Sequence, residues 1–366
     1  MKRRAVYCIA GAFLVMLIPL SCWMYLALGD APPGDALKRF ESQPNYYDGR
    51  FHNADPAAGV AVGPLDAAGI IVEHFRKPPR TRPAAPVPSV TSDLNAVTRS
   101  ASVVWFGHSS YLIRSKGYTV LVDPVLCGYA GPLPCMMRAF RGSDAYHPGD
   151  LPAIDLLVIT HDHFDHLSRE TVIRLKKKIR RIIAPVGVGS HFVFWGFDPS
   201  MITELSWNET SVLRDGVRIT AVPAQHLSGR GFVRDRTLWA SFVLRVHGVT
   251  LFIGGDGGYG AHFREIGATY GPFDLVMLEN GRYNRRWSAI HMRPEEVIAA
   301  AIDLRARMVM PVHWGKFETR SHDWNEPIRR LLREAGRRGV VVTVPMIGET
   351  YPVGAPARRA AWWELD

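Results

Sequence analysis

Six residues in the middle of the chain, His161 to His166, concentrate side chains that bind metal ions. They lie within the stretch THDHFDHL at positions 160–167, which holds three histidines and two aspartates. Imidazoles and carboxylates are the ligands of catalytic zinc sites, which leave one coordination position open for water. Packing alone does not account for so many polar groups after an apolar strand, because burying them without partners costs free energy. The stretch therefore predicts a metal site, with His161 and His163 directed at one ion and Asp165 and His166 at another.

Three later segments place a further candidate ligand at the end of an apolar strand. They are VPAQH with His226, GGDGGY with Asp256, and MPVHWG with His313. Each is weak by itself, since a single histidine at a strand end is usually hydrogen-bonded and a glycine-rich turn with aspartate is usually only a turn. The glycines around Asp256 would let the backbone approach a metal centre closely.

The motif His-x-His-x-Asp-His, followed in order by these three segments, resembles the signature of the metallo-β-lactamase superfamily. The resemblance implies two Zn²⁺ ions per chain. It assigns His161, His163 and His226 to the first ion, Asp165, His166 and His313 to the second, and Asp256 to both. Two such ions activate a bridging water as hydroxide, so the resemblance implies a zinc-dependent hydrolase whose hydroxide attacks phosphorus.

Within the superfamily, the chain is most similar to N-acyl-phosphatidylethanolamine-hydrolysing phospholipase D and its bacterial relatives. The similar stretches are WFGHSS from Trp105, VDP from Val122, YGPFD from Tyr270, His291 with PEE from Pro294, and HWGKF from His313. The stretch ENGRYN at 279–284 and Gly257, where threonine is usual, depart from the animal enzyme. The resemblance thus implies a phosphodiesterase acting on a phospholipid, while these departures leave the exact lipid open.

Two further residues are candidates for the catalytic machinery beside Asp256. Asp162 is not a family ligand, and it is predicted either to orient a ligand or relay a proton, or to stabilise the loop. The resemblance places His291 on the substrate phosphate, and the alternative is a helix-capping or surface histidine. His108 and Asp123, each after a strand, are interpreted as structural residues.

Short β-rich runs come first after residue 102, and strands alternating with helices follow. Helices are expected at 169–178, 261–270, 294–304 and 326–335. Two mixed sheets packed face to face with helices outside satisfy this order. We therefore expect an α+β fold, the αββα metallo-β-lactamase sandwich, over residues 95–366.

The N-terminus predicts a membrane anchor. Three basic residues within positions 1–4 precede 24 uncharged residues, 5–28, and a helix of that length spans roughly 36 Å, enough for a hydrocarbon core of about 30 Å. The basic residues favour a cytoplasmic N-terminus, which predicts a single-pass inner-membrane protein with a periplasmic catalytic domain. A cleaved signal peptide is the alternative. Residues 29–94, rich in Pro, Ala and Gly, are expected to form a spacer and an irregular arm.

Composition narrows the function further. The 44 Lys+Arg against 34 Asp+Glu give a net charge of +10, which suits an anionic membrane or an acidic substrate. No nucleic-acid-binding motif accompanies the charge, so nucleic acid is not an expected partner. Cys127 and Cys135 are interpreted either as a disulfide or as two thiols. A lactonase, a non-lipid phosphodiesterase, and a non-catalytic, metal-stabilised binding protein are the alternative functions.

Overall fold

The structure is a computed structural model, which describes residues 18–32, 34, 36–55, 78, 80–98, 100–231, 233–284, 287–319, 322–358 and 360–365. Residues 5–17 of the predicted membrane span lie outside these ranges. Within the described ranges, no helix combines the length and the apolar character needed to cross a membrane.

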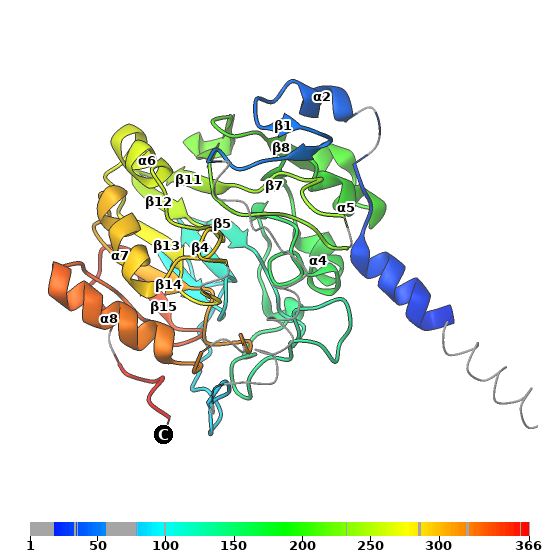
Figure 1. The fold of residues 1–366 in the computed structure, drawn as a ribbon. Coiled ribbons are helices and arrows are strands. Elements are labelled where there is room, and N and C mark those ends of the chain that lie inside the picture. Colours follow the sequence, from blue (N-terminus) through cyan, green and yellow to red (C-terminus); the bar gives the residue numbers. More distant parts are fainter. Residues whose placement is uncertain are drawn as a thin grey trace, which may run out of the picture.

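Two mixed β-sheets form the centre of the molecule (Figure 1). The first has the order β15-β3-β4-β5-β6-β7-β8, with β3 (Ser102–Trp105), β4 (Tyr111–Ser115), β5 (Tyr118–Val122), β6 (Leu156–Val158), β7 (Ile182–Pro185), β8 (Ile202–Leu205) and β15 (Thr350–Pro352). The second has the order β14-β13-β12-β11-β10-β9, with β9 (Thr210–Val212), β10 (Arg218–Val222), β11 (Ser241–Val246), β12 (Val249–Ile253), β13 (Leu275–Glu279) and β14 (Val309–Val312).

Both faces of the first sheet are covered, because every residue of β3 and β4 is buried. Successive side chains of a strand point to opposite faces. Accordingly, Val103 and Ile113 belong to the large cluster shared with the second sheet, whereas Val104 and Leu112 belong to a separate cluster. Continuous apolar strands are thus what a sheet in the middle of a layered fold requires.

Helices form the two outer layers (Figure 1). The first sheet packs against α4 (Arg169–Leu175) and α5 (Gly189–Phe194). The second packs against α6 (His262–Tyr270), α7 (Pro294–Asp303) and α8 (Glu326–Arg338). The four expected helices correspond to α4 with the 3₁₀ turn that follows it, α6, α7 and α8, so the αββα arrangement is confirmed.

The chain before the first sheet lies on the surface of this sandwich. Residues 18–28 form a helix whose C-terminal end lies against the body, while its other end points away (Figure 1). The arm contains α2 (Leu37–Glu41) and the short strands β1 (Tyr46–Tyr47) and β2 (Arg50–Phe51). Phe40 and Phe51 anchor it in a small cluster with Trp239. Cys127 and Cys135 are both free thiols.

Candidate metal centre

The candidate ligands meet because parallel strands end at one edge of each sheet. Strand β5 runs parallel to β6, and β12, β13 and β14 run parallel to one another. The carboxyl ends of parallel strands meet at the same edge and are the usual place for a site in open α/β sheets. The residues at these ends are Asp123 after β5, His161 to His166 after β6, Asp256 after β12, Glu279 at the end of β13 and His313 after β14.

The first group consists of His161, His163 and His226, whose ring nitrogens converge. His161 Nε2 lies 2.9 Å from His163 Nδ1, and His226 Nε2 lies 3.3 Å from the same atom. The outward nitrogens have other partners: His161 Nδ1 lies 3.0 Å from Thr160 Oγ1 and His226 Nδ1 lies 3.0 Å from the carbonyl of Ile290. Such contacts fix which nitrogen of each ring faces the centre.

Burial keeps this first group neutral. It lowers the pKa of His161 and of His226 well below the ordinary value. Burial also lowers the pKa of His163, against the nearby carboxylates, to about 4. At neutral pH all three imidazoles therefore offer an unprotonated nitrogen, which is the form that binds a metal ion.

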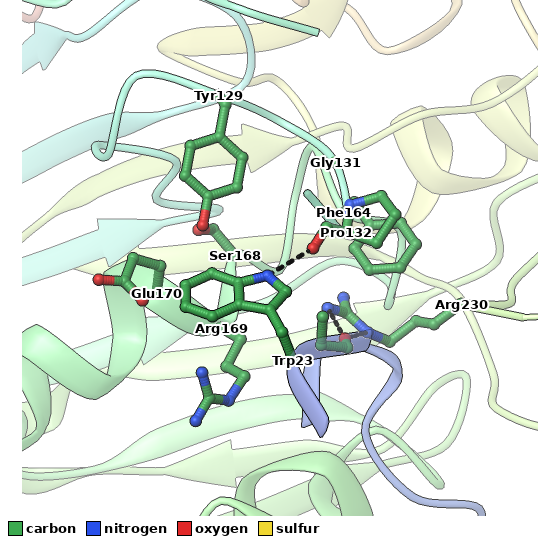
Figure 2. A pocket seen from close by; sticks show the side chains of 10 residues that line it. Trp23, Tyr129, Gly131, Pro132, Phe164, Ser168, Arg169, Glu170 and Arg230 are labelled. Atoms are coloured by element: carbon green, nitrogen blue, oxygen red, sulfur yellow. Dashed lines mark hydrogen bonds between the residues drawn. The ribbon is translucent and has the colours of Figure 1, made fainter. Parts of the chain in front are cut away.

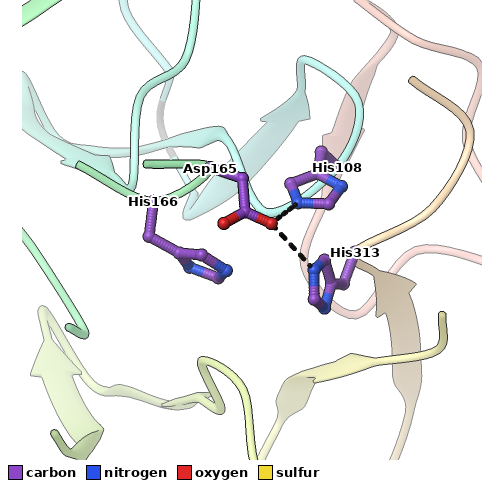
Figure 3. A group of neighbouring side chains, drawn as sticks. All are labelled: His108, Asp165, His166 and His313. Carbon is purple, nitrogen blue, oxygen red and sulfur yellow. Dashed lines mark hydrogen bonds and ion pairs between the residues drawn. The ribbon is translucent and has the colours of Figure 1, made fainter. Parts of the chain in front are cut away.

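The second group consists of His108, Asp165, His166 and His313 (Figure 3). Asp165 Oδ2 lies 3.0 Å from His108 Nε2 and 3.5 Å from His313 Nε2. The resemblance assigned Asp165, His166 and His313 to one ion, and these three residues lie together. His108 is an additional member that the sequence suggested only as a structural residue.

Asp256 connects the two groups. Its Oδ1 lies 2.8 Å from His313 Nδ1 and 3.2 Å from His166 Nε2, and its Oδ2 lies 3.8 Å from His226 Nε2. The preceding Gly255 has φ +62°, and a Cβ there would lie 2.8 Å from the Thr160 Cβ. The glycine therefore lets the loop of Asp256 pass directly over the loop of the His161–His166 motif, as a shared ligand requires.

Two histidines of the second group, His166 and His313, carry protons in the absence of an ion. Burial alone would lower the pKa of His166, but the carboxylates of Asp256 and Asp123 outweigh it and raise that pKa to about 10. His313 likewise has its pKa raised well above the ordinary value, because Asp256 and Asp165 outweigh its burial. The positive charge of these protonated rings balances the buried carboxylates, and a bound cation would supply the same charge.

The donor set fits metal ions. His166 Nε2, His313 Nε2 and Asp256 Oδ1 are buried, and apart from the ion-pair contacts among these residues and with Asp165 they make no hydrogen bond to any described part of the chain. Buried polar atoms are normally satisfied, so three such atoms among facing imidazoles and a carboxylate indicate that a ligand completes their coordination. The seven imidazole and carboxylate residues of the two groups, together with Asp256, can hold two divalent ions.

Further residues orient the ligands from behind. Asp123 Oδ2 accepts a hydrogen bond from His166 Nδ1 at 2.8 Å and from Thr160 Oγ1 at 2.7 Å. Glu279 Oε2 lies 2.7 Å from His291 Nδ1 and 3.2 Å from His313 Nδ1. Carboxylates that hold the second ring nitrogen of a ligating histidine are a common feature of metal sites.

Asp162 belongs to none of these groups of candidate ligands. Its Oδ2 lies 3.2 Å from His191 Nε2 and accepts a hydrogen bond from Thr237 Oγ1 at 3.0 Å, and its Oδ1 accepts from the Gly229 amide at 2.6 Å. These three hydrogen-bond partners of the Asp162 carboxylate are not among the candidate ligands. His291, in contrast, lies beside Asp256 and Glu279 in a group of possible ligands.

The sequence did not single out Glu279, Arg282 or Arg230 as functional residues. Glu279 ends an apolar strand, which is the same signal that identified Asp256. Arg282 donates to Asp165 Oδ2 at 2.9 Å, and Arg230 holds the backbone of the metal-binding loop at the carbonyls of Asp162 and Leu167. Neither arginine has a local sequence signal, because both act across long separations in the chain.

Comparison with known proteins agrees with this geometry. Residues 118–314 match the family model of the beta-lactamase superfamily domain. The chain belongs to the beta-lactamase superfamily. An uncharacterized protein of Mycobacterium tuberculosis is 38% identical over 381 residues, covering 100% of both chains. N-acyl-phosphatidylethanolamine-hydrolyzing phospholipase D 1 of Caenorhabditis elegans is 29% identical over 266 residues, covering 68% of this chain and 73% of that protein.

A solved structure shows the same fold. Igni18, a metallo hydrolase from Ignicoccus hospitalis, aligns with a TM-score of 0.54 at 22% identity, covering 69% of this chain and 97% of that chain. With the superfamily domain and these relatives, the protein is a metal-dependent hydrolase of the metallo-β-lactamase fold. The predictions of the family and of an enzyme are confirmed.

Proposed function

We propose that this superfamily member is a zinc-dependent phosphodiesterase that acts on a phospholipid at a membrane surface. The observation that carries the proposal is the pair of donor groups that share Asp256. The similarity to a phospholipase D that hydrolyses N-acyl-phosphatidylethanolamine supports the lipid substrate. Two Zn²⁺ ions, when bound, supply an activated water and positive charge for the phosphate oxygens.

Each residue of the site has a separate proposed role in metal binding or substrate binding. His161, His163 and His226 present three neutral nitrogens, while Asp165, His166 and His313 form the second set and Asp256 belongs to both. His291 is nearly buried, at 7% exposed, and its Nδ1 is held by Glu279. Its Nε2 is therefore available to meet a phosphate oxygen, which is the role we propose for His291. Asp162 is proposed only to stabilise the loop.

An anionic substrate is supported by Arg282. Its Nη1 donates to Asp165 at 2.9 Å, and its side chain keeps 28% of its surface exposed. A partly exposed guanidinium beside a metal ligand offers hydrogen bonds to a phosphate. A lactone carries no charge before the reaction and gains less from the guanidinium on binding, so Arg282 favours a phosphodiester over a lactone as the substrate.

We also propose that the protein is anchored in the inner membrane with a periplasmic catalytic domain. The catalytic domain binds the helix through Trp23 and the carbonyls of Leu26 and Ala27, which takes these positions out of the lipid. Residues 5–22 carry no charge, and a helix of that length would span about 27 Å, close to a hydrocarbon core of about 30 Å. The anchor would thus end directly at the catalytic domain.

The test is an assay of the metal-loaded full-length protein on three substrates: N-acyl-phosphatidylethanolamine in vesicles, bis(p-nitrophenyl) phosphate and an acyl-homoserine lactone. We expect hydrolysis of both phosphodiesters and a KM about 10–100-fold higher for them in Arg282→Gln, since a charge-assisted hydrogen bond contributes about 1.5–3 kcal/mol. Arg245→Gln, an exposed change on β11, is the control. Faster turnover of the lactone than of either phosphodiester would contradict the proposal.

A further inference from the structure

The C-terminal end of the 18–28 helix is fastened to the catalytic domain by indole and guanidinium groups. Trp23 Nε1 donates to the carbonyl of Pro132 at 2.8 Å, and Trp195 Nε1 donates to the carbonyl of Leu26 at 2.8 Å. Arg230 Nη2 donates to the carbonyl of Ala27 at 2.7 Å (Figure 2). The last carbonyls of a helix have no partner within it, and a cation is favoured there by the helix dipole.

The same guanidinium holds the metal-binding loop. Arg230 Nη1 donates to the carbonyl of Asp162 at 2.8 Å and to that of Leu167 at 2.7 Å. These two carbonyls flank the segment 163–166, which carries three of the candidate ligands. The Arg230 Cζ also lies 4.2 Å from the ring centroid of Phe164 in the middle of that segment, so the arginine contacts the loop at both ends and at its centre.

Arg230 is a buried cation at the contact between the helix and the catalytic domain. It is only 5% exposed, and burial lowers its pKa to about 10, which leaves it charged at neutral pH. Its guanidinium carbon Cζ also lies 5.3 Å from the ring centroid of Trp195, the residue that donates to the carbonyl of Leu26. A buried cation is costly unless it is fully hydrogen-bonded, and here the helix supplies one of the carbonyls that satisfy it.

The helix also fits closely against the loop. The cavity between them, lined by Trp23, Ala27, Phe164 and Arg230 among others (Figure 2), has a volume of only about 10 Å³, which is room for about one water. A second contact runs through Gly29, where a Cβ would lie 2.3 Å from His191 Nδ1, and His191 in turn contacts Asp162.

From these contacts we propose that the 18–28 helix is a positioning element of the metal centre. Its docked end completes the hydrogen bonding of Arg230, and Arg230 then holds the 162–167 segment in the conformation that presents Asp165 and His166. Displacement of the helix releases the segment from this conformation and weakens the binding of the second ion. The inference rests on the proposed ligand role of Asp165 and His166, but the loop itself can be observed without any metal.

The test compares hydrogen exchange of the peptides 18–28 and 161–168 in the metal-free, full-length protein in detergent micelles. Arg230→Met keeps an apolar stem but removes every hydrogen bond, and Ala27→Trp places an indole where the cavity has no room for it. We expect peptide 161–168 to exchange at least tenfold faster in both variants, with partial rescue by Arg230→Lys. Leu20→Ala, at an exposed position of the same helix, is the control and should match the unmodified protein.

Zinc affinity, measured by competition with a chromophoric chelator, is the second readout. We expect the second ion to bind about 10–100-fold more weakly, the usual effect of losing an outer-shell partner. The first ion should be affected less, because His161 and His226 lie outside the clamped segment. Unchanged exchange of 161–168 in folded Arg230→Met, or faster exchange of 18–28 alone in Ala27→Trp, would overturn the inference. If Asp165 and His166 prove not to bind zinc, the hydrogen-exchange result still decides whether the helix positions the 162–167 segment.

Discussion

The two metal ions should respond differently to pH, because their ligands carry protons differently before the ions bind. His163 has a pKa of about 4, and burial holds the pKa values of His161 and His226 low as well. The first ion therefore displaces no proton from these rings above about pH 5. His166 has a pKa of about 10, so it must lose a proton before it can bind the second ion.

The size of the effect follows from the distance between that pKa and the working pH. One pH unit corresponds to about 1.36 kcal/mol, so at pH 7 the three units below a pKa of about 10 cost about 4 kcal/mol, or about a thousandfold in apparent affinity. The sign is fixed: the protonated form competes with the ion, and raising the pH removes the competitor. The affinity for the second ion should rise about tenfold per pH unit between pH 6.5 and 8.5, and more steeply if His313, whose pKa is also raised, loses its proton in the same step.

The assay is a two-site zinc titration of the metal-free, full-length protein against a chelator of known pH dependence, repeated at half-unit intervals. The His313→Gln variant is the matched control, since it removes a ligand of the second ion and leaves the first group intact. Its remaining site should show a nearly constant affinity across the range. A second-ion affinity that stays flat over two pH units, or equal slopes for both ions, would refute the assignment of protons to the second group.

Two further substitutions test the residues behind the ligands. In Asp123→Asn the amide can place an N–H against His166 Nδ1, which turns the proton of that ring toward the metal, and we expect about 10–100-fold weaker binding of the second ion in the same titration. In Glu279→Gln one oxygen still accepts from the Met292 amide, as Oε1 does in the present structure at 2.9 Å, so the NH₂ faces His291. We expect kcat for a phosphodiester to fall about 10–100-fold while the first ion remains bound, and an unchanged kcat would remove Glu279 from the mechanism.

The local sequence was sufficient for the parts of the site that one short segment contains. His161, His163, Asp165 and His166 lie within six residues after an apolar strand, so a strand followed by a tight loop must bring them near one another. The amphipathic and proline-initiated segments likewise predicted α4, α6, α7 and α8, because helix signals depend on neighbours within a few turns. The order of the later motifs then supplied the family and, through it, the other ligands.

Only the tertiary structure decided which side of the loop each residue occupies and which distant residues support it. Asp162 alternates with the ligands in sequence, yet its carboxylate is directed to His191 and Thr237. Glu279 lies 12 residues from His291 in the sequence, and Arg230 lies 68 residues from Asp162. Local sequence patterns do not predict contacts over such separations. Motif residues can be predicted from sequence because local backbone geometry orders them, whereas the groups that hold them in place are chosen by how two sheets and the N-terminal helix pack together.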